Sequence, residues 1–114
     1  MSRPRIRHIA IMVEDREKAA EFYKQVFGMV EKERNPRATI YLSDGEVDLA
    51  LIQSSKSPKG INHLGFQVDN VSEIERMANT TATPSPPGSG RHAEFWILDA
   101  EGNKVDISEE GWPI

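Results

Sequence analysis

The sequence contains no cysteine among its 114 residues, and this absence removes several kinds of chemistry. Disulfide bonds, zinc–thiolate sites, iron–sulfur clusters and cysteine nucleophiles are all excluded. No apolar run approaches the roughly 18–20 residues that span a membrane. The start of the chain also lacks the hydrophobic region of a signal peptide. We therefore expect a cytoplasmic protein with no membrane partner.

The chain also lacks a long run of residues with the same charge. There are 14 basic and 18 acidic residues, interleaved along the sequence, and the net charge is −4. A nucleic-acid surface needs a basic patch, so we expect no nucleic-acid partner. The content of 38% hydrophobic and 28% charged residues is that of an ordinary globular protein, and the length fits one domain over residues 1–114.

What the chain does contain is a two-fold internal repeat. The stretch "RHIAIMVEDREKAAEF" (7–22) aligns without a gap on "NHLGFQVDNVSEIERM" (62–77), so that His8 falls on His63. Later, "IYLSDGEVDLALI" aligns on "FWILDAEGNKVDI", and one extra residue in the second turn places Ala50 on Asp106. A repeat of this length indicates one supersecondary unit used twice. We expect module 1 over about 1–57 and module 2 over about 58–114.

Each module is predicted to have the order βαβββ, which makes the protein an α+β fold. In module 1 we expect a first strand at "RIRHIAIMV", then a helix that begins after Asp15 and ends at Gly28. The apolar stripe of this helix is predicted as Ala19, Phe22, Tyr23, Val26 and Phe27. Further strands are expected at 29–34, 38–43 and 47–53, then at 61–68, 93–98 and 104–108, with a second helix at 71–79 and at most a short edge strand near 82–85.

The alternation of strand residues predicts where the polar side chains point. His8 lies opposite the apolar face of the first strand, and His63 and Asp106 take the same side of their strands. Two imidazoles and a carboxylate suit divalent Fe, Mn, Zn, Ni or Co, and three ligands leave room for a substrate. The alternative is that each histidine is a surface residue or is hydrogen-bonded within the protein.

The segment "NTTATPSPPGSGR" (79–91) is predicted to be a loop because it carries three prolines and two glycines. It is either a lid over a site or a solvated connector. Arg91 at its end either meets a carboxylate or phosphate of a substrate or is a solvated side chain. The neighbouring His92 either acts as an acid or base near neutral pH or is a surface residue.

The segments "HIAIMVEDREKAAEFYKQVFGM", "HLGFQVDNV" and "FWILDAEGNKVDI" resemble the vicinal oxygen chelate superfamily of glyoxalases, extradiol dioxygenases, epimerases and bleomycin-resistance proteins. The resemblance implies two paired βαβββ modules in a half-open barrel around a divalent metal, and a homodimer. It places the metal positions on His8, Ala50, His63 and Asp106. Ala50 replaces the Glu or Gln of the glyoxalases and epimerases, which counts against both activities. Asp106 replaces the usual Glu.

The sequence leaves two main functions open, and a structural or regulatory partner protein is a third alternative. The first is a metal-dependent enzyme, dioxygenase-like or lyase/transferase-like, with a small oxygen-chelating substrate and with His8, His63 and Asp106 as ligands. No catalytic acid or base is assigned. The second is a metal-free binding protein like the bleomycin-resistance proteins. The substrate pocket is expected to be lined by Met12, Tyr41, Ala50, Arg91, His92 and Trp96.

Overall fold

The computed structural model describes residues 3–114, and its chain divides into two compact units. The first unit comprises residues 8–62 together with 113 and 114. The second unit comprises residues 63–112 together with the segment that ends at Arg7. Each unit is described by itself. The single domain over residues 1–114, with modules that meet near residue 57, stays a prediction.

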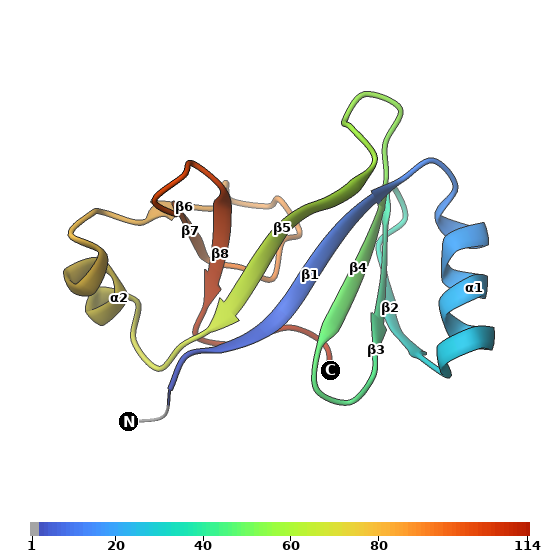
Figure 1. The fold of residues 1–114 in the computed structure, drawn as a ribbon, viewed down its shortest axis with the longest axis horizontal. Coiled ribbons are helices and arrows are strands. Elements are labelled where there is room, and N and C mark those ends of the chain that lie inside the picture. The colour runs from blue at the N-terminus through green and yellow to red at the C-terminus, as the bar shows by residue number, and fades with distance from the viewer. Residues whose placement is uncertain (1–2) are drawn as a thin grey trace. The chain divides into compact units, whose positions relative to one another are not determined.

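The first unit has one helix and four strands. Its elements are β1 (Arg5–Val13, from His8 onward), α1 (Arg16–Phe27), β2 (Val30–Arg34), β3 (Thr39–Ser43) and β4 (Asp48–Gln53). Within this unit the strand order is β2-β3-β4-β1, with β1 parallel to β4 and the other neighbours antiparallel. Helix α1 packs on β3 and β4, as Figure 1 shows.

The second unit repeats this order. It contains β5 (Gly60–Gln67, from His63 onward), α2 (Val71–Ala78), the two-residue strand β6 (Thr83–Pro84), β7 (Phe95–Leu98) and β8 (Lys104–Ser108). The strand order is β5-β8-β7-β6, and β5 is parallel to β8. The predicted α+β class with two βαβββ modules is therefore confirmed, including the short strand expected within residues 82–85.

The pairing of the strands confirms the alignment of the two repeats. In the first unit Ala10 of β1 lies across from Ala50 of β4. In the second unit Gly65 of β5 lies across from Asp106 of β8. Ala50 and Asp106 therefore occupy the same place in the two modules, as the extra residue in the second turn requires.

Short-range interactions set the ends of both helices. The carboxylate of Asp15 accepts the backbone N–H of Lys18 at 3.0 Å and so caps the start of α1. Gly28 ends this helix with a φ of 68°, a left-handed conformation that glycine adopts without a Cβ clash. In the second unit Asn70 caps α2 in the same way as Asp15 caps α1. The helix boundaries predicted at Asp15 and Gly28 are confirmed.

Each unit has its own apolar core between the helix and the sheet. In the first unit Ile40, Leu42 and Leu51 are fully buried, and α1 packs on this core through two alanines and Tyr23. The core of the second unit is formed by Val68, Val71, Ala82 and Ile107. In the described residues no helix is long and apolar enough to cross a membrane.

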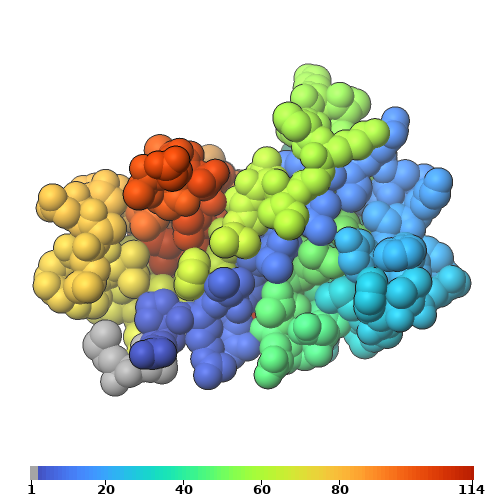
Figure 2. All heavy atoms as spheres, viewed as in Figure 1, coloured from blue at the N-terminus to red at the C-terminus, as the bar shows by residue number. Residues whose placement is uncertain are grey.

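The predicted apolar stripe of α1 is wrong in part. Ala20 is the buried residue of this helix, with Ala19 and Tyr23 packed beside it. Phe22, Val26 and Phe27 are instead 53%, 56% and 66% exposed, on the surface of a helix that Figure 2 shows in blue to cyan. Small residues on the inner side bring the helix close to the sheet, and the larger apolar side chains then project outward.

Candidate functional site

His8 is held by a carboxylate that the sequence did not point to. It lies on β1 directly across from Asp48 on β4. Its Nδ1 lies 2.7 Å from Oδ2 of Asp48, and both side chains are buried, at 4% and 0% exposed. Because a carboxylate only accepts at this distance, Nδ1 carries the proton. Nε2 is therefore the nitrogen through which His8 would bind a metal.

His63 and Asp106 come together in the second unit. Nε2 of His63 lies 3.0 Å from Oδ2 of Asp106, and the two residues are 8% and 1% exposed. Two donor atoms that bind one ion at about 2.1 Å, with an angle of about 90–110° between them, are themselves about 3.0–3.4 Å apart. The imidazole nitrogen and the carboxylate oxygen thus have the separation expected of two ligands of one metal ion.

Asp106 has a second partner in Arg91. The guanidinium Nη2 lies 2.6 Å from both carboxylate oxygens of Asp106. A buried carboxylate needs such a partner, since an uncompensated charge in a protein interior costs several kcal/mol. The interpretation of Arg91 as a merely solvated side chain is therefore wrong. Whether it also meets a substrate stays a prediction.

A second cation lies near this carboxylate. Lys104, two residues before Asp106 on β8, places its ammonium 5.1 Å from the centre of the Trp96 ring, within the range of a cation–π contact. Burial lowers the pKa of Lys104, and the positive charge of Arg91 lowers it further, while Asp106 acts in the opposite direction. Lys104 was not among the site residues expected from the sequence.

The two modules carry their carboxylates at different places on equivalent strands. The shift of 56 residues that places Ala50 on Asp106 also places Asp48 on Lys104. The first unit thus has Asp48 and Ala50, and the second has Lys104 and Asp106. A carboxylate two residues away stays on the same face of a strand, so strand periodicity was the signal that would have found Asp48.

The other residues expected at a substrate pocket lie in different surroundings. Tyr41 and Ala50 are buried and pack with Ala10 on the face of the sheet opposite α1. Met12 is half-buried on β1. His92 is half-buried, and its carbonyl oxygen accepts a hydrogen bond from Oγ of Ser108 at 3.2 Å. The role of these residues and of Trp96 in binding a substrate stays a prediction.

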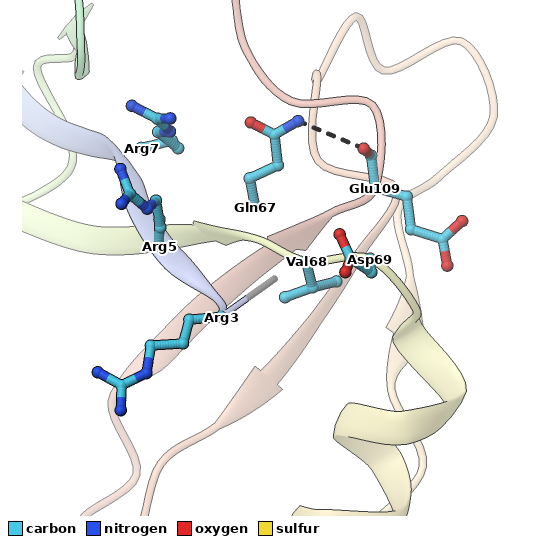
Figure 3. Close-up of a pocket in the computed structure, with 7 residues that line it drawn as sticks. All are labelled: Arg3, Arg5, Arg7, Gln67, Val68, Asp69 and Glu109. Atoms are coloured by element: carbon cyan, nitrogen blue, oxygen red, sulfur yellow. Dashed lines mark hydrogen bonds between the residues drawn. The ribbon is translucent and has the colours of Figure 1, made fainter. Parts of the chain in front are cut away.

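A separate pocket of about 510 Å³ lies in the second unit. Figure 3 shows three guanidinium groups on one side of it and two carboxylates on the other. The residues that line it are Arg3, Arg5, Arg7, Gln67, Val68, Asp69 and Glu109. Both signs of charge therefore line this pocket.

The family model of the glyoxalase/bleomycin resistance protein/dioxygenase superfamily matches residues 5–107, which is nearly the whole chain. The chain belongs to this superfamily. The family resemblance seen in the sequence is thereby confirmed, and the match includes both histidines and Asp106.

Solved structures of other proteins share the fold of this superfamily member. A hypothetical protein of Bacillus halodurans C-125 matches with a TM-score of 0.70 and 20% identity over 93% of this chain and 94% of its own. A variant of Streptomyces coelicolor methylmalonyl-CoA epimerase, in complex with 2-nitronate-propionyl-CoA, matches with a TM-score of 0.63 and 22% identity over 95% and 99% of the two chains.

The 2,3-dioxygenase LapB from Pseudomonas sp. KL28 is a third similar structure. It matches with a TM-score of 0.73 and 20% identity over 96% of this superfamily member, which spans only 41% of the LapB chain. At these identities the likeness shows the fold alone. An epimerase and a dioxygenase catalyse different reactions, so the reaction must be argued from the residues of this chain.

Proposed function

We propose that this protein is a divalent-metal-dependent enzyme that acts on a small substrate able to chelate the metal through adjacent oxygens. His8, His63 and Asp106 are the proposed ligands. The observation that carries the proposal is the buried pair of His63 and Asp106, whose donor atoms lie 3.0 Å apart. Superfamily membership and the place of His8 in the repeat support the third ligand.

The donor set fits a divalent transition metal. Two neutral imidazoles and one carboxylate suit Fe, Mn, Zn, Ni or Co, and three protein ligands leave positions for a substrate. Metal-binding histidines usually donate their other ring N–H to a carboxylate or carbonyl, which holds the tautomer and the orientation of the ring. Asp48 is placed to do this for His8, since it accepts from Nδ1 at 2.7 Å.

The residues also narrow the class of reaction. A bound divalent ion supplies a Lewis acid that stabilises negative charge on a substrate oxygen. Ala50 offers no acid or base at the position where the glyoxalase and epimerase members have one. We therefore favour dioxygenase-like or lyase/transferase-like chemistry, with His92 as the candidate proton carrier.

A second candidate function is metal-free binding of a small molecule. It is favoured by the pairing of Arg91 with Asp106, because a proposed ligand is already neutralised by a protein cation. In this case His63 pairs with Asp106 within the second unit, and His8 pairs with Asp48 within the first, with no metal on either pair. The bleomycin-resistance type of binding protein is the corresponding family precedent.

Metal content distinguishes the two functions. The protein is purified without an affinity tag under anaerobic conditions, and its metal is measured by elemental analysis. We expect about one ion per chain in the wild type, and loss of the ion in His8→Ala and His63→Ala. His92→Ala, at the only other histidine of the sequence, is the matched control and keeps the ion.

Circular dichroism of each variant distinguishes the loss of a metal ligand from the loss of the fold. Unchanged metal content in folded His63→Ala would show that the ligand assignment is wrong. If the wild type holds no metal even after reconstitution with Fe(II), Mn(II) and Zn(II), the metal-free binding protein is the better description. Iron would direct the assays to oxygen-dependent ring cleavage, and manganese to thiol transfer.

We also propose that the protein forms a homodimer, as the family resemblance implies. The exposed apolar side chains of Phe22, Val26 and Phe27 on α1 support an association of this kind, since contiguous apolar surface marks interaction sites. Sedimentation velocity over a hundredfold range of concentration tests the proposal. A monomer throughout that range would contradict it.

A further inference from the structure

We propose that Arg91 and Lys104 form a receptor for a carboxylate group of the substrate, and that Arg91 becomes available to it when Asp106 ligates a metal. This inference rests on the proposed metal-dependent function and specifies the charge of its substrate. All of the contacts that carry it lie within the second unit.

The Arg91–Asp106 pair does not have the fork geometry. A single nitrogen, Nη2, meets both oxygens of Asp106 at 2.6 Å. In the stronger fork arrangement, two nitrogens of a guanidinium each meet one oxygen. The side chain of Arg91 is also 30% exposed, whereas that of Asp106 is only 2% exposed. Arg91 thus reaches a buried carboxylate from the solvent side and can leave it without unpacking the core.

Arg91 and Lys104 are two cations near one carboxylate, since Arg91 contacts both oxygens of Asp106 and Lys104 lies two residues before Asp106 on β8. The Trp96 ring holds the Lys104 ammonium in place through a cation–π contact of 5.1 Å. Arg91, Lys104 and Asp106 together carry one net positive charge as long as Asp106 is the counter-ion of the two cations.

When a carboxylate ligates a divalent ion, the ion compensates its negative charge. The carboxylate then no longer neutralises a nearby guanidinium. Arg91 and Lys104 then form a site with two positive charges and one aromatic wall. A substrate carboxylate restores the missing counter-ion, and a guanidinium binds carboxylates with several directed N–H donors.

Hydrogen bonds at the base of the loop that carries Arg91 hold this residue near Asp106. At its base, Oγ of Ser85 donates to the carbonyl oxygen of Ala93 at 2.6 Å, and the backbone N–H of Ser85 donates to the carbonyl oxygen of Glu94 at 2.9 Å. Gly88 and Gly90 have positive φ angles in the turn above this base. With the base closed, rotation of the Arg91 side chain alone is sufficient to move the guanidinium from Asp106 to a substrate.

Calorimetric titrations test both halves of the exchange. The proteins are the wild type, Arg91→Ala, Lys104→Ala and the control Arg76→Ala, which removes an exposed arginine paired with Glu73 on α2. Mn²⁺ is titrated first, and malonate is then titrated into the Mn²⁺-loaded proteins. Arg91→Gln, which keeps a polar side chain without the charge, replaces Arg91→Ala if that variant does not fold.

Because a hydrogen bond to a charged group is worth about a tenfold change in binding or more, we expect two opposite effects. Arg91→Ala binds Mn²⁺ about tenfold more tightly than the wild type, since the ion no longer displaces a protein cation. The Mn²⁺-loaded Arg91→Ala and Lys104→Ala proteins bind malonate about tenfold more weakly. Arg76→Ala matches the wild type in both titrations.

Each contrary result has its own meaning. If all variants bind Mn²⁺ and malonate as the wild type does, the receptor is wrong while the metal-dependent function stands. If Arg91→Ala binds Mn²⁺ more weakly, Arg91 supports the metal site and the exchange is overturned. If no protein in the series takes up Mn²⁺ or another divalent ion, the proposed function fails and the exchange fails with it.

Discussion

Replacing Asp48 by asparagine isolates the part that this carboxylate plays in the proposed metal binding. The substitution keeps the size of the side chain and an oxygen that accepts the N–H of His8, but it removes the negative charge. The buried 2.7 Å contact is at the short end of the range for charge-assisted hydrogen bonds. We therefore expect folded Asp48→Asn with weaker metal binding.

The size of the effect follows from the position of Asp48 behind the proposed ligand. Loss of a carboxylate that orients a metal-binding histidine typically lowers the affinity for the metal about 10- to 100-fold. This corresponds to about 1.4–2.7 kcal/mol of binding free energy. Since asparagine still accepts from Nδ1, we expect a value near the lower end, and Asp48→Ala should lie near the upper end.

Mn²⁺ titrations by calorimetry measure this effect, with circular dichroism melts to confirm folding. Glu73→Gln is the control, because it neutralises a carboxylate that pairs with Arg76 on the same helix, α2. Folded Asp48→Asn that binds Mn²⁺ within twofold of the wild type would refute the reasoning. It would mean that His8 is not a ligand or that its orientation does not depend on the charge of Asp48.

Three further predictions concern the stability of the first unit. Leu51→Ala should lower the free energy of unfolding by about 2–5 kcal/mol, because Leu51 is fully buried; urea unfolding measures this. Gly28→Ala should cost about 1 kcal/mol in the same assay because φ is 68°, and no loss would show that the helix end relaxes. Arg34 and then Lys24 lower the pKa of Glu31 from 4.5 to about 2. Glu31→Gln should therefore be less stable than the wild type at pH 7, and melting temperatures should converge as the pH falls from about 4.5 towards 2, whereas a constant difference would exclude this linkage.

Much of the fold follows from local sequence signals. The carboxylate of Asp15 and the glycine at position 28 set the ends of α1, and alternation along the strands placed His63 and Asp106 on one face. The exposed Phe22 and Val26 could not be predicted, because the apolar period of a helix does not say how wide a face its sheet covers.

The candidate site was predicted less completely than the fold. The contact of Arg91 with Asp106 depends on the course of a loop that has no periodicity, so only the structure brings the two together. Asp48 was missed for a different reason: the comparison of repeats drew attention to Ala50 as the counterpart of Asp106. The carboxylate of the first unit stands two residues earlier on the same face.

The placement of Asp48 and Asp106 has a consequence for how a duplicated module can diverge. A charged residue that moves by one position along a strand crosses to the face that packs on the helix, and there it would disrupt the core. A move by two positions keeps the residue on the polar face with a different neighbour. Mutations that shift a carboxylate along a strand of such modules are therefore confined to an even number of positions. In one copy the carboxylate can then orient a histidine, and in the other it can itself serve as the proposed metal ligand.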